Sequence, residues 1–172
     1  PGKGKSYAIN LLLKEVTSDI LIFTDGDVYL GENSINGIVE LFKDPQIGVV
    51  GGRVASANKK NEQFGYWSHL LADTGAHRIR KQLFNKGRFL ECSAYLFAFR
   101  NNVIKEYPLD VAEDAIIPYM FYIKNYKIGY AEKALVYVKN PDNFEDWLKQ
   151  RKRTAKAHET LTKYYPEFPK IK

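Results

Sequence analysis

Two aspartates separated by one glycine, Asp25 and Asp27, follow directly after the apolar run at residues 20–24. A short continuous apolar run of this kind is typical of a strand that is buried on both faces. Open α/β sheets bind their ligands beyond the carboxyl ends of such strands. Two carboxylates at this spacing can hold Mg²⁺ or Mn²⁺, with water and phosphate oxygens as the other ligands. Because Asp and Gly are also common turn residues, the preceding buried strand is what favours a binding role.

A second acidic pair, Glu113 and Asp114, precedes the apolar stretch at residues 115–121. One interpretation is a helix N-cap, in which a carboxylate oxygen accepts a free backbone N–H. The other is a general base, whose pKa would be set by burial and by neighbouring charges. The segment by itself favours neither interpretation.

A basic segment at residues 146–158 has the pattern of a helix. Such a charge run is most often a solvated face or a surface for anionic polymers. On this helix Gln150, Arg153 and Thr154 share one side, whereas Arg151 lies toward Trp147. Arginines that face a site could instead stabilise a leaving diphosphate through paired N–H donors.

The chain opens with PGKGKS, which resembles the end of the phosphate-binding pattern G-x-x-x-x-G-K-[ST]. The first glycine of that pattern, and the strand that feeds the loop, would have to precede Pro1. An NTPase with residues 20–24 as its magnesium-binding strand is therefore the weaker alternative. Since the chain starts without a methionine, we expect it to be a piece of a longer protein.

Helical and strand patterns alternate along the chain, which predicts an α/β layer fold with a largely parallel sheet. Asn33 or Ser34 can cap the second helix, and Asp44-Pro45 would end it. The predicted helices are 5–16, 34–42, 61–84, 114–122 and one starting near Asp142, and the predicted strands are 20–24, 47–55, 94–100, 127–131 and 134–138.

Length and composition fit a single domain or most of one, with 172 residues of which 45% are hydrophobic. The formal net charge of +6 favours anionic partners. A nucleic-acid-binding module is a second alternative, but the basic residues are spread over many elements and the aromatic residues stand in apolar runs that are typical of a core.

The remaining composition excludes several classes of protein. Cys92 is the only cysteine, so the chain has no internal disulfide, and a reducing compartment is expected. The histidines lie too far apart in sequence to suggest a structural zinc site. No apolar run approaches the roughly 20 residues of a membrane-spanning helix.

Taken in order, five motifs resemble the inverting glycosyltransferases of family 2, which include cellulose, chitin and hyaluronan synthases. They are GKSYAIN (4–10), DGD (25–27), Ser93 with AFR (98–100), ED (113–114) and QRKR (150–153). The resemblance covers nearly the whole chain. It implies the GT-A fold, a Rossmann-like, mixed and mostly parallel sheet flanked by helices, here as a single partial catalytic domain over 1–172. The family's first βα unit would precede Pro1.

The resemblance also implies roles for individual residues. Asp114 would be the catalytic base and Asp27 the ligand of Mg²⁺ or Mn²⁺. The residues implied to bind substrate are Asp25, Ser93, Glu113, Gln150, Arg151 and Arg153. The donor would be a nucleotide-diphospho sugar, expected to be a UDP-sugar, and the acceptor a hydroxyl on a glycan or lipid-linked sugar. Nucleic acid is not an expected partner, and the longer protein is expected in the cytoplasm or at the cytoplasmic face of a membrane.

Two positions depart from the family pattern. Thr154 stands where the family's Q-x-x-R-W motif has tryptophan, which puts stacking against an acceptor sugar and processive synthesis in doubt. Ala94 stands where glycine is frequent, which is a smaller change.

Overall fold

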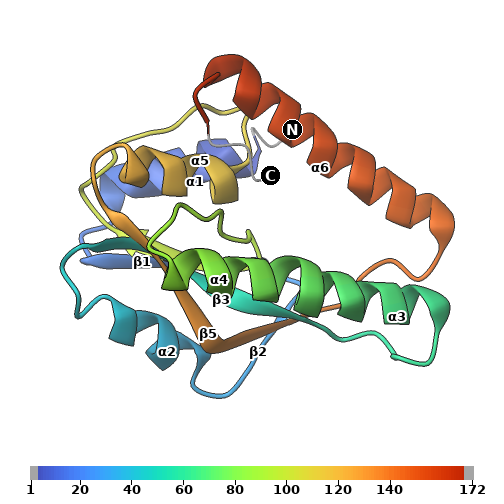
Figure 1. Ribbon diagram of the computed structural model, residues 1–172. Helices are drawn as coiled ribbons and strands as arrows, with labels where there is room; N and C mark the ends of the chain where they lie inside the picture. Colours follow the sequence, from blue (N-terminus) through green and yellow to red (C-terminus); the bar gives the residue numbers. More distant parts are fainter. Residues whose placement is uncertain (1–3, 169–172) are drawn as a thin grey trace.

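A computed structural model describes residues 4–168, along most of which helices and strands alternate as predicted (Figure 1). None of the helices in this range is both long enough and apolar enough to cross a membrane. In chain order the elements are α1 (Lys5–Glu15), β1 (Ile20–Thr24), β2 (Tyr29–Leu30), α2 (Ser34–Leu41), β3 (Ile47–Ser56), α3 (Gln63–Leu70), the π-helical segment η1 (Leu71–His77), α4 (Arg78–Asn85), β4 (Leu96–Arg100), α5 (Glu113–Tyr122), β5 (Lys127–Val138) and α6 (Phe144–Tyr164).

The strands form one 5-stranded mixed sheet in the order β1-β4-β3-β5-β2. β3 and β5 pair in parallel, whereas the β1–β4, β4–β3 and β5–β2 pairs are antiparallel. The predicted mixed α/β sheet is confirmed. Parallel pairing is less frequent than expected, because β4 lies between β1 and β3 and runs in the opposite direction to both. Strands β1, β3 and β5 still share one direction, so their carboxyl ends meet at the same edge.

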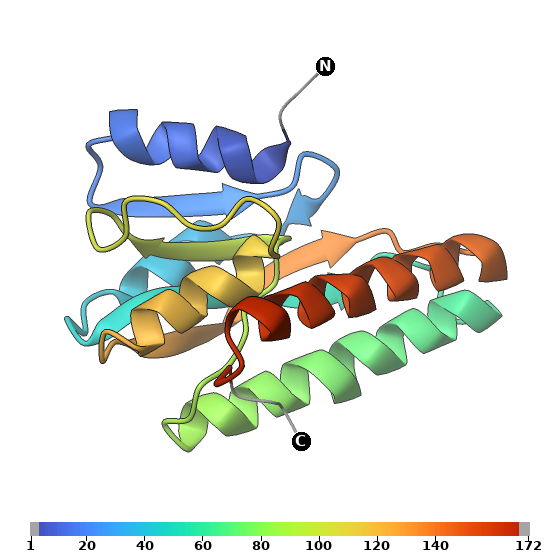
Figure 2. The same cartoon turned by 90° about the horizontal axis from the view of Figure 1, so that it is seen from above.

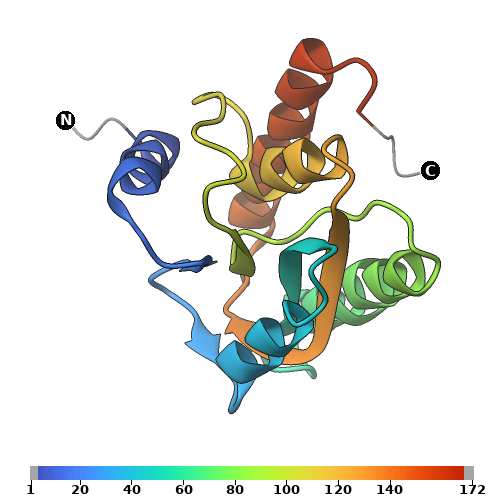
Figure 3. The same ribbon diagram turned by 90° about the vertical axis from the view of Figure 1, so that its left-hand side faces the viewer.

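The sheet has one hydrophobic cluster on each face, because side chains alternate along its strands. On one face Phe97 and Phe99 of β4 pack with residues of α1 and α5. On the other face the adjacent Leu96 and Ala98 pack with Ile38 of α2. Figure 3 shows α2 and α6 on opposite sides of the molecule.

β5 joins two segments that the sequence predicts as separate strands. Its register jumps from Ala131 opposite Gly52 to Leu135 opposite Arg53, so the residues between form an irregularity inside one strand. β2 is not predicted from the sequence. It consists of only two residues, and its pairing with β5 is a contact across more than a hundred positions that no local pattern reports.

The predicted helix at 61–84 is confirmed as a helical run from α3 through η1 to α4. Its middle part is π-helical, a geometry that often marks functional sites. α6 starts at Phe144, two residues later than predicted, with Asn143 as its N-cap; the Asn143 side chain accepts the Asp146 N–H. Figure 2 shows α3, η1 and α4 beside α6.

Two residues of the family-like motifs support the fold. Asn10 on α1 donates its side-chain N–H to the Tyr107 carbonyl at 2.8 Å and accepts the Tyr107 N–H at 3.1 Å. Arg100, at the end of β4, donates to the carbonyls of Ile47 and Phe42. These contacts fasten α1 and the α2–β3 connection to the rest of the domain.

Candidate active site

Two adjoining clefts lie where β1, β3 and β5 end. The narrower has a volume of ≈ 330 Å³ and the wider one of ≈ 750 Å³. Five residues line both clefts: Asp25, Tyr95, Asn140, Gln150 and Arg153. The edge that the sequence indicates as a ligand-binding edge therefore carries a cleft, and α6 forms its opposite wall.

The predicted DGD turn forms one wall of the wider cleft. Thr24 donates its hydroxyl to the Tyr95 carbonyl at 2.9 Å, which fixes the end of β1 against the start of β4. Asp25 is partly buried, and Asp27 is exposed at the cleft. Within residues 4–168 no three His, Cys, Asp or Glu side chains are arranged to hold a metal ion. Asp27 with the oxygens of a diphosphate does fit such an ion, since Mg²⁺ typically uses one or two carboxylates together with substrate phosphates.

Asp114 lies in the first turn of α5 and lines the narrower cleft. Its Oδ2 accepts the Ala94 backbone N–H at 3.1 Å. Burial, followed by the negative charge of Glu113, raises the pKa of Asp114 above its ordinary value, although the Ala94 N–H and Arg80 act in the opposite direction. The N-cap of α5 is Ala112, so the capping interpretation of Glu113 and Asp114 is wrong.

Lys5 connects the two acidic motifs. Its Nζ lies 2.6 Å from Asp25 Oδ1 and 2.6 Å from Glu113 Oε1. Burial alone would lower the pKa of Lys5, but the two carboxylates raise it above the usual value. Glu113 is not among the residues that line either cleft; its side chain is 12% exposed and pairs with Lys5. The sequence places Glu113 at the substrate, whereas its observed partner is this lysine.

The basic segment of α6 contributes the predicted residues. Gln150, Arg151, Arg153 and Thr154 line the narrower cleft. The Arg151 guanidinium lies over the Trp147 ring, 5.9 Å from its centroid, as the helical spacing predicts, and donates to Gln150 Oε1 at 2.9 Å. Thr154 donates its hydroxyl to the Gln150 carbonyl within the helix.

Several residues of the clefts carry no recognisable signal in the sequence. Tyr95 is one of them; it lines the narrower cleft together with Ser93, which the sequence does predict as a substrate-binding residue. Arg80, on α4, donates to the carbonyls of Glu91 and Cys92 and so holds the segment that reaches Asp114. The π-helical segment contributes Leu71, Ala72 and Ala76 to the wall facing α6.

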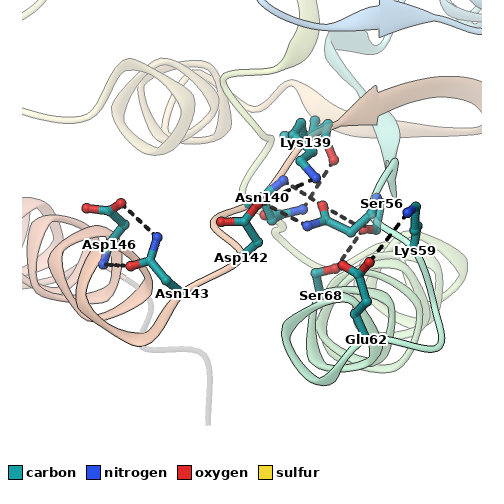
Figure 4. A network of polar contacts seen from close by, with 11 residues as sticks. Ser56, Lys59, Glu62, Ser68, Lys139, Asn140, Asp142, Asn143 and Asp146 are labelled. Carbon is teal, nitrogen blue, oxygen red and sulfur yellow. Dashed lines mark hydrogen bonds and ion pairs between the residues drawn. The ribbon is translucent and has the colours of Figure 1, made fainter.

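Asn140 is positioned by a polar network at the ends of β3 and β5 (Figure 4). Asn58 donates to the Asn140 carbonyl at 2.9 Å, and the Asn140 N–H donates to Asn58 Oδ1 at 2.7 Å. The hydroxyls of Ser56 and Ser68 lie 2.7 Å apart and join β3 to α3. The connection between β5 and α6 is thus tied to the same framework as α3.

Solved structures support the fold. The mannosyltransferase PcManGT from Pyrobaculum calidifontis, determined in complex with GDP-Man and Mn²⁺, superposes with a TM-score of 0.67 at 16% sequence identity. The match covers 98% of this chain and 45% of that protein. At this identity the likeness establishes the fold alone, which is the predicted GT-A type.

Curated relatives and a family model match the same region. The poly-beta-1,6-N-acetyl-D-glucosamine synthases of Staphylococcus aureus (strain COL) and Staphylococcus epidermidis (strain ATCC 35984) are each 24% identical over 181 residues. These matches cover 99% of this chain and 42% of each synthase, so the chain spans about two fifths of their length.

These matches disfavour both alternative interpretations, the NTPase and the nucleic-acid-binding module. Lys5, the described lysine of the opening GKGKS segment, pairs with carboxylates in the structure; Gly2 and Lys3 lie outside the described residues. The family model described as "Glycosyltransferase like family 2" matches residues 1–157. The chain therefore belongs to the family 2-like glycosyltransferases.

Proposed function

We propose that this domain transfers a sugar from a nucleotide-diphospho sugar, expected to be a UDP-sugar, to a hydroxyl of a glycan or lipid-linked acceptor. The observation that carries the proposal is the convergence of Asp27, Asp114 and Arg153 on two adjoining clefts. There a carboxylate able to hold a cation, a carboxylate with a raised pKa and an arginine able to bind a diphosphate would act on one substrate. The comparisons support it in part: the similar synthases are named for making poly-beta-1,6-N-acetyl-D-glucosamine, and the solved mannosyltransferase was determined with GDP-Man and Mn²⁺.

On the donor side, Asp27 would hold Mg²⁺ or Mn²⁺ together with the diphosphate oxygens. The ion would supply positive charge to the diphosphate as the glycosidic bond breaks. From the opposite wall Arg153, with Gln150 beside it, would donate N–H groups to the same diphosphate. Asp25, held by Lys5, would face the ribose or the water shell of the ion. Arg151 would add positive charge, and Ser93 would contact the sugar.

On the acceptor side, Asp114 would accept the proton of the attacking hydroxyl. The acceptor oxygen would form a bond to the anomeric carbon as the bond from that carbon to the diphosphate breaks. The products would be a glycoside of inverted configuration and a nucleoside diphosphate. A carboxylate whose pKa is raised toward neutral pH is a more effective base for this proton transfer.

Calorimetric titration of UDP and of GDP, with and without Mn²⁺ and with ATP as the comparison, tests the donor site. We expect one diphosphate to bind in a manganese-dependent manner and Asp27→Ala to lose that binding. Asp19→Ala is the matched control, because Asp19 precedes the opposite end of β1 and is exposed.

Two results would count against the proposal. If neither UDP nor GDP binds to the longer protein that contains this domain, the transferase assignment fails. If a diphosphate binds equally to the parent and to Asp27→Ala, the metal ligand is wrongly assigned. The configuration of the product, read by NMR, tests the inversion.

A further inference from the structure

Four aromatic side chains form a continuous cluster at one end of the paired helices. Phe64 and Trp67 lie on α3, and Phe144 and Trp147 on α6. Ring centroids are 5.3 Å apart for Phe64 and Trp67, 5.9 Å for the two tryptophans, and 6.2 Å for Phe144 and Trp147. We call this cluster the aromatic platform. Figure 2 shows the two helix segments side by side, extending away from the sheet.

The aromatic platform adjoins the clefts. Trp67 precedes Leu71 by one helical turn, and Trp147 precedes Arg151 by one turn; Leu71 and Arg151 both line the narrower cleft. Asp142, which lines the wider cleft, lies two residues before Phe144. A ligand that leaves the clefts along the two helices would therefore reach the platform next.

The four residues of the platform differ in exposure: three are partly buried and Phe144 is open to solvent. The partly buried Trp67 and Trp147 contact each other between α3 and α6. Phe144 adds little to that contact, since its side chain is 59% exposed. The platform thus presents one open aromatic side chain, backed by three partly buried ones, beside a cleft.

The chemistry of the platform suits a sugar ring. The face of an aromatic ring carries partial negative charge. The C–H bonds on one face of a pyranose are weakly positive and apolar, so the two faces attract each other and exclude water. α6 contributes only polar side chains to the lining of the clefts within its described length, and Thr154 is one of them. A stacking surface on this helix therefore exists only outside the clefts.

We propose that the aromatic platform binds the sugar units of a glycan acceptor that lie beyond the unit at the reaction centre. The proposal rests on the transferase function proposed above, because the clefts must hold the reacting end of the same glycan. It commits to a carbohydrate chain of two or more units, stacked on Phe144 and the tryptophans.

Intrinsic fluorescence tests the proposal directly, because both tryptophans of the chain belong to the platform. The probes are oligosaccharides, from the disaccharide upward, of β-1,6-linked N-acetylglucosamine, β-1,4-linked glucose and mannose. We expect at least one series to change the fluorescence saturably and to bind more tightly as it lengthens. Phe144→Ala should weaken binding about five- to tenfold, since a stacked aromatic contact contributes on the order of one factor of ten.

Tyr164→Ala is the matched control. Tyr164 lies at the far end of the same helix and is exposed to a similar degree, 53%, so its loss should leave the affinity unchanged. Because Phe144 is exposed, its replacement is not expected to unfold the domain. Circular dichroism of both variants checks this.

Three outcomes would overturn the proposal. The first is that no oligosaccharide changes the fluorescence, and the second is that Phe144→Ala binds as tightly as the parent. The third is that vesicles of anionic phospholipid change the fluorescence while oligosaccharides do not, which would make the platform a membrane contact. Diphosphate binding without oligosaccharide binding would leave the transferase assignment intact. Oligosaccharide binding by a longer protein that binds neither UDP nor GDP would contradict the transferase, and with it the assignment of the platform to an acceptor.

Discussion

Asp114, the proposed base, is a buried carboxylate whose ionised form lowers the stability of the folded protein. Burial and the charge of Glu113 raise the pKa of its carboxyl, so the ionised form is less stable in the folded protein than in the unfolded chain. A raised pKa in the folded state contributes stability below the ordinary pKa of aspartate, about 4. That contribution is lost as the pH rises through the folded-state pKa.

Replacing Asp114 by Asn should therefore have opposite effects on activity and stability at neutral pH. Transfer should fall about 10²–10⁴-fold because the proton acceptor is lost. The thermal midpoint should rise, since a buried charge is removed while the amide oxygen can still accept the Ala94 N–H. Product assays and calorimetry at several pH values measure the two effects.

The pH dependence separates this explanation from a general stabilisation. The gain in midpoint should shrink as the pH falls through the folded-state pKa and vanish below about pH 4, where the parental carboxyl is protonated in both states. A gain that is the same at every pH would show that charge burial is not its cause. Transfer at the parental rate would show that Asp114 is not the base.

Lys5 forms ion pairs with both acidic motifs of the site. A lysine in the first turn of a helix looks like a solvated basic residue, and its sequence neighbours support that interpretation. In the structure its Nζ is shared by Asp25 and Glu113, which stand 20 and 108 positions away in the chain and belong to the two acidic motifs. The pairing neutralises part of the negative charge next to Asp114, and only the tertiary fold reveals it.

At the level of elements, the Asn58–Asn140 pair fixes the connection from β5 to α6. Both hydrogen bonds cross the ends of β3 and β5, and Asn58 is 5% exposed. Removing its side chain would remove both hydrogen bonds to the Asn140 backbone, and each such bond contributes about 0.5–1.5 kcal/mol.

Replacing Asn58 by Ala should lower the free energy of unfolding by about 2 kcal/mol, as measured by urea denaturation. It should also weaken diphosphate binding, because Asn140 lines both clefts. Asn61→Ala is the control: this neighbouring asparagine is exposed, and its loss should change stability by less than about 0.5 kcal/mol. Equal unfolding midpoints for the two variants would mean that the Asn58 hydrogen bonds do not stabilise the domain.

The elements that the sequence predicts correctly have strong local patterns. The apolar run of β1 and the helical spacing of Ile35, Ile38 and Val39 in α2 are fixed by near neighbours along the chain. The expectation that β1 is buried on both faces is wrong, because β1 lies at the edge of the sheet and only its Leu21 is buried. β2 and the reversed direction of β4 depend on partners distant in sequence. The same holds for the residues of the cleft. Those in the motifs can be predicted from the sequence, whereas Tyr95, Asn140 and the π-helical wall belong to no motif and line the cleft only because of the tertiary fold.

At the scale of the whole molecule, the clefts lie between the edge of the sheet and α6, a helix with few buried side chains. Of the 21 residues of α6, only Leu161 is buried. The first half of the helix, which carries Gln150 and Arg153, is held mainly by the Trp67–Trp147 contact and the Asn143 cap. Segments with few buried contacts open at a lower free energy than the core.

Donor binding should therefore stabilise α6 more than any other helix. A diphosphate held between Asp27 on the sheet side and Arg153 on α6 would join the two walls, and binding to the folded helix stabilises it by mass action. Hydrogen exchange of the α6 amides should slow when Mn²⁺ and the bound diphosphate, UDP or GDP, are added, while exchange in the buried strand β4 stays unchanged. Arg153→Ala should bind the diphosphate more weakly and, even when saturated, show a smaller slowing in α6. If calorimetry shows binding while α6 exchanges at its original rate, the diphosphate does not contact this helix, and the cationic partner of the leaving group must lie elsewhere.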